Sequence, residues 1–346
     1  MLRKPIFWII LLGFVLRIGS MTTNYQQMRW ENDARMSIPA ARILEGKGFT
    51  LQDGAGPTAY RPPLYILWLT FAYAIFGKFA TLGPSFMQIV VSTGNILLLF
   101  LLTRQIWKRD DAANTAALLL AIHPYTVYHD AALYHTFLST ALLLGGFLLL
   151  FTGIETKRFA HLFWSGLLFG LCVLILSTIV PFVGLLIVAG LVAWKITLKS
   201  RVILVAAFVL GLSLGWGPWI VRNAIVFHNF IPLTTESGVT LWVGNSPYAK
   251  KLLPTQEQEA TPVPDGTAFN FPERYAGCVV SKCRGGVTEH EENKALTALA
   301  INWIKTHPKD FVELTVWRYT NIWSPFLTPN KTFFTFRTLN ILVTYG

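Results

Sequence analysis

Long apolar runs alternate with short polar connections over the first two-thirds of the chain. Seven of these runs are candidate spans, and several of them are near the roughly 20 residues that a helix needs to cross the hydrocarbon core of a bilayer. The seven runs are residues 5–18, 86–103, 112–128, 136–154, 159–176, 179–194 and 202–221. The pattern predicts an all-α polytopic membrane protein with about seven spans, the first of them retained at the N-terminus.

A further apolar run, residues 64–77, is only about 14 residues long, which suits an interfacial helix better than a span. If it lies at the interface, four basic groups fall on one face of the membrane. They are Arg3 and Lys4; Arg104, Lys108 and Arg109; Lys157 and Arg158; and Lys195, Lys199 and Arg201. The positive-inside rule makes that face cytoplasmic, so we expect a cytoplasmic N-terminus.

Three polar segments then lie on the opposite face, at about residues 22–85, 129–135 and 223–332. The first contains the longest polar stretch in the first two-thirds of the chain. We divide the chain into a transmembrane module (1–222), an outer segment (223–332) and the start of a further span (333–346). Because that last run breaks off at Gly346, we expect a fragment or an unusually short member of its class.

The outer segment is predicted to contain two helices. The periodic stretch that begins near Glu289 should end before Pro308, since proline interrupts a helix. A second, amphipathic run over residues 311–323 carries several aromatic side chains, which favours a place on the membrane surface.

Composition supports a membrane setting. Hydrophobic residues make up 53% of the chain and charged residues only 14%, against about 25% charged residues in soluble domains. The net charge of +11 comes mainly from short loops between apolar runs, so it orients the chain in the bilayer and does not indicate a nucleic-acid partner. The three cysteines fall in two settings. Cys172 lies in an apolar run. Cys278 and Cys283 lie in the outer segment, where they form either a disulfide or a pair of free thiols.

Asp33 is the first candidate for chemistry, because it follows the first apolar run and opens a helical stretch. It is either a general base that takes a proton from a hydroxyl group or an N-cap, and the two roles are compatible. Glu31 and Asp53 are the other acids of this loop and rank lower.

Two arginines are candidates for binding phosphate. Arg61 precedes two prolines, which stiffen the backbone that presents its guanidinium. Arg222 follows Pro218 at the outer end of the last apolar run, where the positive-inside rule disfavours a basic residue. For both, the alternative to phosphate binding is a side chain that snorkels toward the membrane surface.

The second outer turn, YHDAALYHT, places His129, Asp130 and His135 within seven residues. They are candidates for a substrate pocket, with helix capping by Asp130 and a metal site as alternatives. The chain has no glycine-rich phosphate loop and no nucleotide-binding fingerprint. We therefore expect no cofactor and no soluble nucleotide-sugar donor, while dependence on a divalent metal stays open.

The order of these features resembles the C-type membrane glycosyltransferases (GT-C), in particular the ArnT-like and protein-mannosyltransferase-like group of families 39 and 83. The resemblance rests on an acid after the first span, RPPLY at Arg61–Tyr65, alternating spans and PWIVRN, which ends at Arg222 and Asn223. It implies a polyprenyl-phosphate sugar donor, such as an undecaprenyl phosphate sugar, in the bacterial inner membrane. It also implies inverting transfer at the periplasmic face, with Asp33 as the general base and a lipid, glycan or protein as acceptor.

The chain departs from that group at three places. His135 stands where many relatives carry a glutamate, so that role passes to Asp130; GLCVLILST (residues 170–178) lacks the Arg-Pro that relatives carry; and the further C-terminal spans are missing. Two alternatives therefore stay open: a transporter or flippase for lipid-linked sugars, and an inactive relative that acts as an assembly partner. A transporter should carry ionisable groups at mid-membrane depth, and the nearly uncharged spans favour a catalyst that works at one face.

Overall fold

The computed structural model describes residues 4–23, 34–51, 56–192, 197–246, 249 and 288–322. All regular secondary structure in this part is helical, apart from one isolated bridge between Thr50 and Pro57. The predicted all-α fold class is therefore confirmed. The chain forms two compact units: the first holds residues up to Pro57 and Arg61–Leu233, and the second holds Thr58–Tyr60 and the residues from Thr234 onward.

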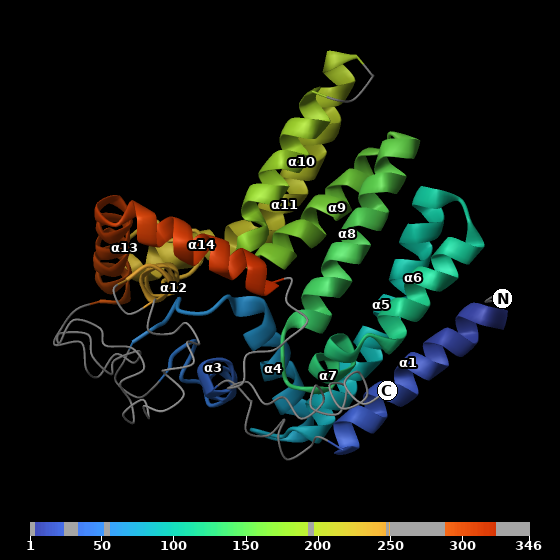
Figure 1. The fold of residues 1–346 in the computed structure, drawn as a ribbon, viewed down its shortest axis with the longest axis horizontal. Coiled ribbons are helices and arrows are strands. Elements are labelled where there is room, and N and C mark those ends of the chain that lie inside the picture. The colour runs from blue at the N-terminus through green and yellow to red at the C-terminus, as the bar shows by residue number, and fades with distance from the viewer. Residues whose placement is uncertain are drawn as a thin grey trace. The chain divides into compact units, whose positions relative to one another are not determined.

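The first unit is a bundle of long apolar helices with shorter helices at one end (Figure 1). Its helices are α1 (Lys4–Thr23), α3 (Ala34–Leu44), α4 (Pro63–Phe76), α5 (Leu82–Trp107), α6 (Asp110–Ile122), α7 (Pro124–Ala131), α8 (Thr136–Thr156), α9 (Phe159–Val173), the 3-10 turn η1 (Ser177–Ile179), α10 (Val180–Val192) and α11 (Leu198–Phe227). Each begins or ends near a polar connection in the hydrophobic pattern.

Four helices of this unit are long and apolar enough to cross a membrane: Pro5–Thr23, Leu82–Trp107, Thr136–Thr156 and Leu198–Phe227. Three shorter apolar helices accompany them, at Pro63–Phe76, Phe159–Val173 and Ser177–Val192. Large apolar side chains such as Trp8, Leu119 and Leu185 are exposed on the surface, as lipid-facing side chains are. The 14 residues of α4 match the short helix expected over residues 64–77.

The run over residues 112–128 corrects an expectation, because it is not one continuous helix. α6 ends at Ile122 and α7 begins at Pro124, with His123 in an extended conformation between them. Proline fixes its own φ and disfavours the helical conformation of the residue before it. Pro124 therefore divides the run into helices of 13 and 8 residues.

Glycines allow α9 and α11 to pack backbone against backbone. Gly166 and Gly170 on α9 face Gly211 and Gly215 on α11, each pair spaced by four residues. A side chain at Gly166 would collide with the carbonyl group of Phe208. This is the small-residue spacing that lets membrane helices approach closely, and it builds the main core of the bundle.

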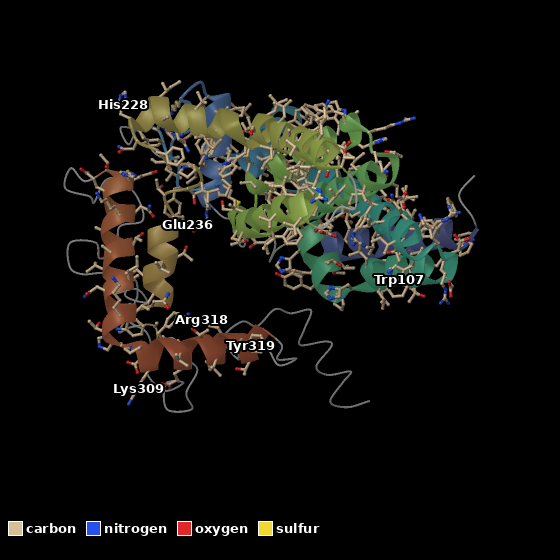
Figure 2. The ribbon with its side chains drawn as sticks, turned by 90° about the horizontal axis from the view of Figure 1, so that it is seen from above. Trp107, His228, Glu236, Lys309, Arg318 and Tyr319 are labelled. Carbon is tan, nitrogen blue, oxygen red and sulfur yellow. The ribbon has the colours of Figure 1, made fainter. Side chains whose placement is uncertain are left out.

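The second unit contains α12 (Ser237–Gly244), α13 (Glu289–Thr306) and α14 (Pro308–Ile322). Its core is formed by Trp242, Ala249, Leu296, Ala300, Trp303 and Leu314. α13 begins with a capping box between Thr288 and Glu291 and ends before Pro308, which confirms the helix predicted there. α14 turns away from α13 near Lys309 (Figure 2). The helix predicted over 311–323 is confirmed, while its place on the membrane surface stays a prediction.

Candidate active site

Asp33, the candidate general base, lies outside the described residues. So do Glu31, Asp53, Cys278 and Cys283. The helix that begins directly after Asp33 is described, because α3 starts at Ala34. Met36 and Ala40 of α3 belong to a buried cluster that also contains Tyr65 of α4. The helix after Asp33 is thus packed against the helix that comes after Arg61.

A buried ion pair joins α1 to α7. The Nε and Nη2 atoms of Arg17 lie 3.0 and 2.9 Å from Oδ2 of Asp130. Arg17 is completely buried, and its Nη1 also donates to the carbonyl groups of Gly13 and Ala121, at 3.1 and 3.3 Å. Asp130, a candidate pocket residue, therefore holds the second outer turn against the first span through this pair.

Tyr65 connects α4 to the same turn through a chain of buried hydrogen bonds. Its hydroxyl group donates to Oε1 of Gln88 at 2.9 Å, and Nε2 of Gln88 donates to the carbonyl oxygen of Ala132 at 2.6 Å. The ring of Tyr65 also meets the ring of His135 edge-on, with 6.2 Å between centroids. Tyr65 is buried, so its evident role is to position the turn that carries His135.

The histidines of the second outer turn are embedded among aromatic rings. His135 stacks on Tyr134 with a centroid distance of 4.3 Å, and the ring centroids of His129 and Tyr125 lie 4.0 Å apart. Burial lowers the pKa of His129 to about 4, so its ring is neutral at pH 7. Within the part of the chain that the structure describes, no three His, Cys, Asp or Glu side chains gather as metal ligands.

Arg222 is surrounded by aromatic rings near the C-terminal end of α11. Its guanidinium carbon lies 4.8 Å from the ring centroid of Trp219, 5.4 Å from that of Phe227 and 5.5 Å from that of Phe49. Cation–π contacts of this kind hold a guanidinium in place without neutralising its charge. Arg222 also borders an open depression beside Pro218, whose lining residues all belong to α11. A positive charge held by aromatic rings therefore lies at an open surface of α11.

Asn223 fixes both Arg222 and the loop after α11. Its Oδ1 accepts a hydrogen bond from Nη1 of Arg222, and its Nδ2 donates to the carbonyl oxygen of Ile231, both at 2.9 Å. The indole nitrogens of Trp216 and Trp219 donate to the next two carbonyl groups of that loop, at 2.6 and 2.8 Å. Asn223 is completely buried, so it positions Arg222.

Replacing Asn223 by Ala is expected to lower the free energy of unfolding by about 1–3 kcal/mol, because the buried carbonyl group of Ile231 loses its donor. Thermal unfolding of the purified protein measures this loss. Asn229→Ala is the matched control, since the exposed Asn229 also donates to a carbonyl group in the same loop, that of Phe227. Equal unfolding temperatures for the two variants would contradict the positioning role.

Arg61 is half-buried and stands two residues before α4. The start of that helix is anchored, because the amide of Leu64 donates to the carbonyl oxygen of Leu174 at the end of α9, at 3.1 Å. Pro62 takes the extended conformation expected before another proline. The backbone that presents Arg61 is therefore well defined on its C-terminal side.

These residues gather toward one end of the first unit. The links from Tyr65 to Gln88 and from Leu64 to Leu174 bring the start of α4 to the start of α5 and the end of α9. At the other end, Lys108 contacts Glu155, which brings the ends of α5 and α8 together. The start of α4 and the basic loop after α5 thus lie at opposite ends of this unit, while the membrane face of each end stays a prediction.

Sequence reasoning missed Arg17 and Gln88. Both lie within or beside apolar runs, which the hydrophobic pattern assigns to the scaffold. A signal for Arg17 was present, because an ionisable residue within a membrane span marks a functional or structural site by default. Nothing in the pattern singled out Gln88.

The family model described as dolichyl-phosphate-mannose-protein mannosyltransferase matches residues 60–219. No curated protein and no solved structure matches the chain. The matched stretch includes Arg61, Tyr65, Asp130 and His135 and ends three residues before Arg222. The match over residues 60–219 therefore supports a GT-C, protein-mannosyltransferase-like group of membrane glycosyltransferases.

Proposed function

We propose that the protein transfers a sugar from a polyprenyl-phosphate donor to a hydroxyl or amine group of a lipid, glycan or protein, with inversion at the anomeric carbon. The reaction takes place at the periplasmic face of the bacterial inner membrane, opposite the basic loops. The family match supports a GT-C glycosyltransferase. The gathering of the candidate residues at one end of the bundle supports a reaction at one membrane face.

The environment of Arg222 is the observation that carries this proposal. The leaving group of a polyprenyl-phosphate sugar is a phosphate, which is already a stable anion and needs no general acid. It does need positive charge near the oxygen that takes up the electrons of the breaking bond. A guanidinium suits phosphate oxygens because it is planar and permanently charged. Arg222 offers such a group beside an open depression on the surface of α11.

The proposed reaction is a single displacement. Asp33 takes the proton of the acceptor group, whose oxygen or nitrogen attacks the anomeric carbon from the face opposite the phosphate. The bond between that carbon and the phosphate oxygen breaks, and polyprenyl phosphate leaves as an anion. Arg61 and Arg222 stabilise the charge that develops on it. One displacement inverts the configuration of the sugar.

The second outer turn contributes by position. We assign His135 to the edge of the sugar pocket, where the glutamate of many relatives stands. Tyr65 packs against its ring and, through Gln88, holds the turn in place. Asp130 also holds this turn in place, because its carboxylate is paired with Arg17.

Replacing Arg222 by Gln is expected to lower the rate of sugar transfer about 10²–10³-fold, since removal of one group that stabilises developing negative charge costs about that much. Arg222→Lys should recover only part of the loss, because an ammonium group lacks the planar contact with the rings. Transfer of a radiolabelled sugar from polyprenyl phosphate measures both variants.

Arg201→Gln is the matched control. Arg201 lies on the same helix, 21 residues or about 32 Å earlier, and donates to the carbonyl oxygen of Leu191. This variant should transfer sugar at the wild-type rate. Wild-type transfer by Arg222→Gln, or an equal loss in Arg201→Gln, would remove the argument for a phosphate contact at Arg222.

A further inference from the structure

Glu289, the first residue of α13, binds two segments that are distant from each other in the sequence. Its Oε1 accepts from the hydroxyl group of Thr58 at 2.6 Å, and its Oε2 accepts from the amide of Ala59 at 3.0 Å. The same Oε2 accepts from the hydroxyl group of Thr235 at 2.9 Å. Three donors thus converge on one carboxylate.

The short segment Thr58–Tyr60 is held by further bonds within the second unit. The amide of Tyr60 donates to the hydroxyl oxygen of Thr58, and the amide of Thr235 donates to the carbonyl oxygen of Ala59, both at 3.0 Å. Thr58, Ala59 and Tyr60 are 3%, 0% and 3% exposed. The segment is therefore folded around Glu289.

The position of this segment along the chain gives Glu289 its importance. Arg61 directly follows Tyr60, so the backbone that leads into Arg61 starts from an anchored residue. Thr235 stands two residues after Leu233, whose carbonyl group accepts from Trp219, a ring in contact with Arg222. Along the chain, the partners of Glu289 thus stand directly before Arg61 and two residues after Leu233.

We propose that Glu289 is a positioning residue for the donor phosphate: by holding Thr58–Tyr60 it fixes the backbone that presents Arg61. The claim about phosphate rests on the proposed function, whereas the anchoring of Thr58–Tyr60 stands without it. Arg61 is followed by two prolines and an anchored helix start, so its backbone is restrained on one side by proline and on the other by Glu289. Loss of Glu289 removes three of the hydrogen bonds around this segment and leaves the bond from the amide of Thr235 to the carbonyl oxygen of Ala59.

Glu291 provides a matched control for Glu289. It lies in the same first turn of α13 and carries the same charge, but its carboxylate accepts from the amide and the hydroxyl group of Thr288, at 2.8 and 2.9 Å. Glu289→Ala and Glu291→Ala therefore each remove one negative charge from the helix start. Glu289→Ala also removes the contacts with Thr58 and Ala59, whereas Glu291→Ala leaves those contacts in place.

The first measurement is hydrogen exchange of the full-length protein in lipid nanodiscs. We expect the amides of Ala59 and Tyr60 to exchange about tenfold faster in Glu289→Ala than in the wild type. In Glu291→Ala their exchange should be unchanged. Unchanged exchange in Glu289→Ala, or equal acceleration in both variants, would overturn the anchoring.

The second measurement is binding of a short-chain polyprenyl phosphate to the same proteins, with Arg61→Gln as the reference for a lost phosphate contact. We expect the dissociation constant to rise about tenfold in Glu289→Ala and in Arg61→Gln, and to stay at the wild-type value in Glu291→Ala. Faster exchange with unchanged binding would overturn the positioning role, as would a wild-type protein that does not bind. Normal binding without sugar transfer would instead count against the proposed function alone.

Discussion

Asp33→Asn is expected to lower the rate of sugar transfer about 10²–10⁴-fold while the donor stays bound. An amide has nearly the shape of a carboxylate but cannot accept the proton of the attacking hydroxyl group. The phosphate leaving group needs no acid, so the loss of one carboxylate removes all of the general acid–base catalysis. Two measurements separate a loss of catalysis from a loss of donor binding. They are turnover of radiolabelled polyprenyl-phosphate sugars in native membranes and binding of the donor to the same membranes.

The neighbouring acids of the first outer loop serve as controls for Asp33. Glu31→Gln and Asp53→Asn remove the same charge from the same loop and should leave the rate of transfer within a few-fold of wild type. If Asp33→Asn turned over at the wild-type rate, the base would have to be sought at Asp130. To act as the base, Asp130 would have to separate from Arg17, with which its carboxylate is paired.

Arg17→Gln is expected to cost about 3–5 kcal/mol of stability, the largest structural effect that we predict. Removing one partner of a buried ion pair leaves the other as an uncompensated charge. Here the remaining charge is Asp130, which is 6% exposed and lies against the first span. The thermal unfolding temperature and the yield of folded protein in detergent measure the loss.

A surface pair provides the comparison for Arg17. Arg104 and Asp110 lie 2.8 Å apart with both side chains partly exposed, and such pairs contribute about 0–1 kcal/mol. Arg104→Gln should therefore unfold close to the wild-type temperature. The double replacement Arg17→Met/Asp130→Leu should recover much of the loss, because it removes both buried charges. Equal stability of Arg17→Gln and the wild type would show that the pair is not needed.

Much of the helical framework follows from the hydrophobic pattern. The short helix α4 and the end of α13 before Pro308 are predictable from run length and from proline, which are local signals. The break at Pro124 is also a local signal, but the apolar residues on both sides of it favoured one continuous run. The glycine spacing at Gly166 and Gly170 was readable too, although its partners on α11 were not.

The candidate site was less predictable because its contacts join residues that are far apart in the sequence. Arg17 and Asp130 are 113 residues apart, and Glu289 is 231 residues from Thr58. Neither pair belongs to a motif with fixed spacing, so only the packed structure brings the partners together. Arg222 stands out in the sequence for its position at the end of a span, but the rings that hold it include Phe49, from another part of the chain.

The most direct test of the central claim is the stereochemistry of the product. The purified protein, in lipid vesicles, would be given a panel of polyprenyl-phosphate sugars of known anomeric configuration together with lipid, glycan and peptide acceptors. We predict that at least one donor yields a product whose new glycosidic bond has the inverted configuration, as determined by nuclear magnetic resonance. Movement of the intact donor across the vesicle membrane without any transfer, or transfer with retained configuration, would contradict the account.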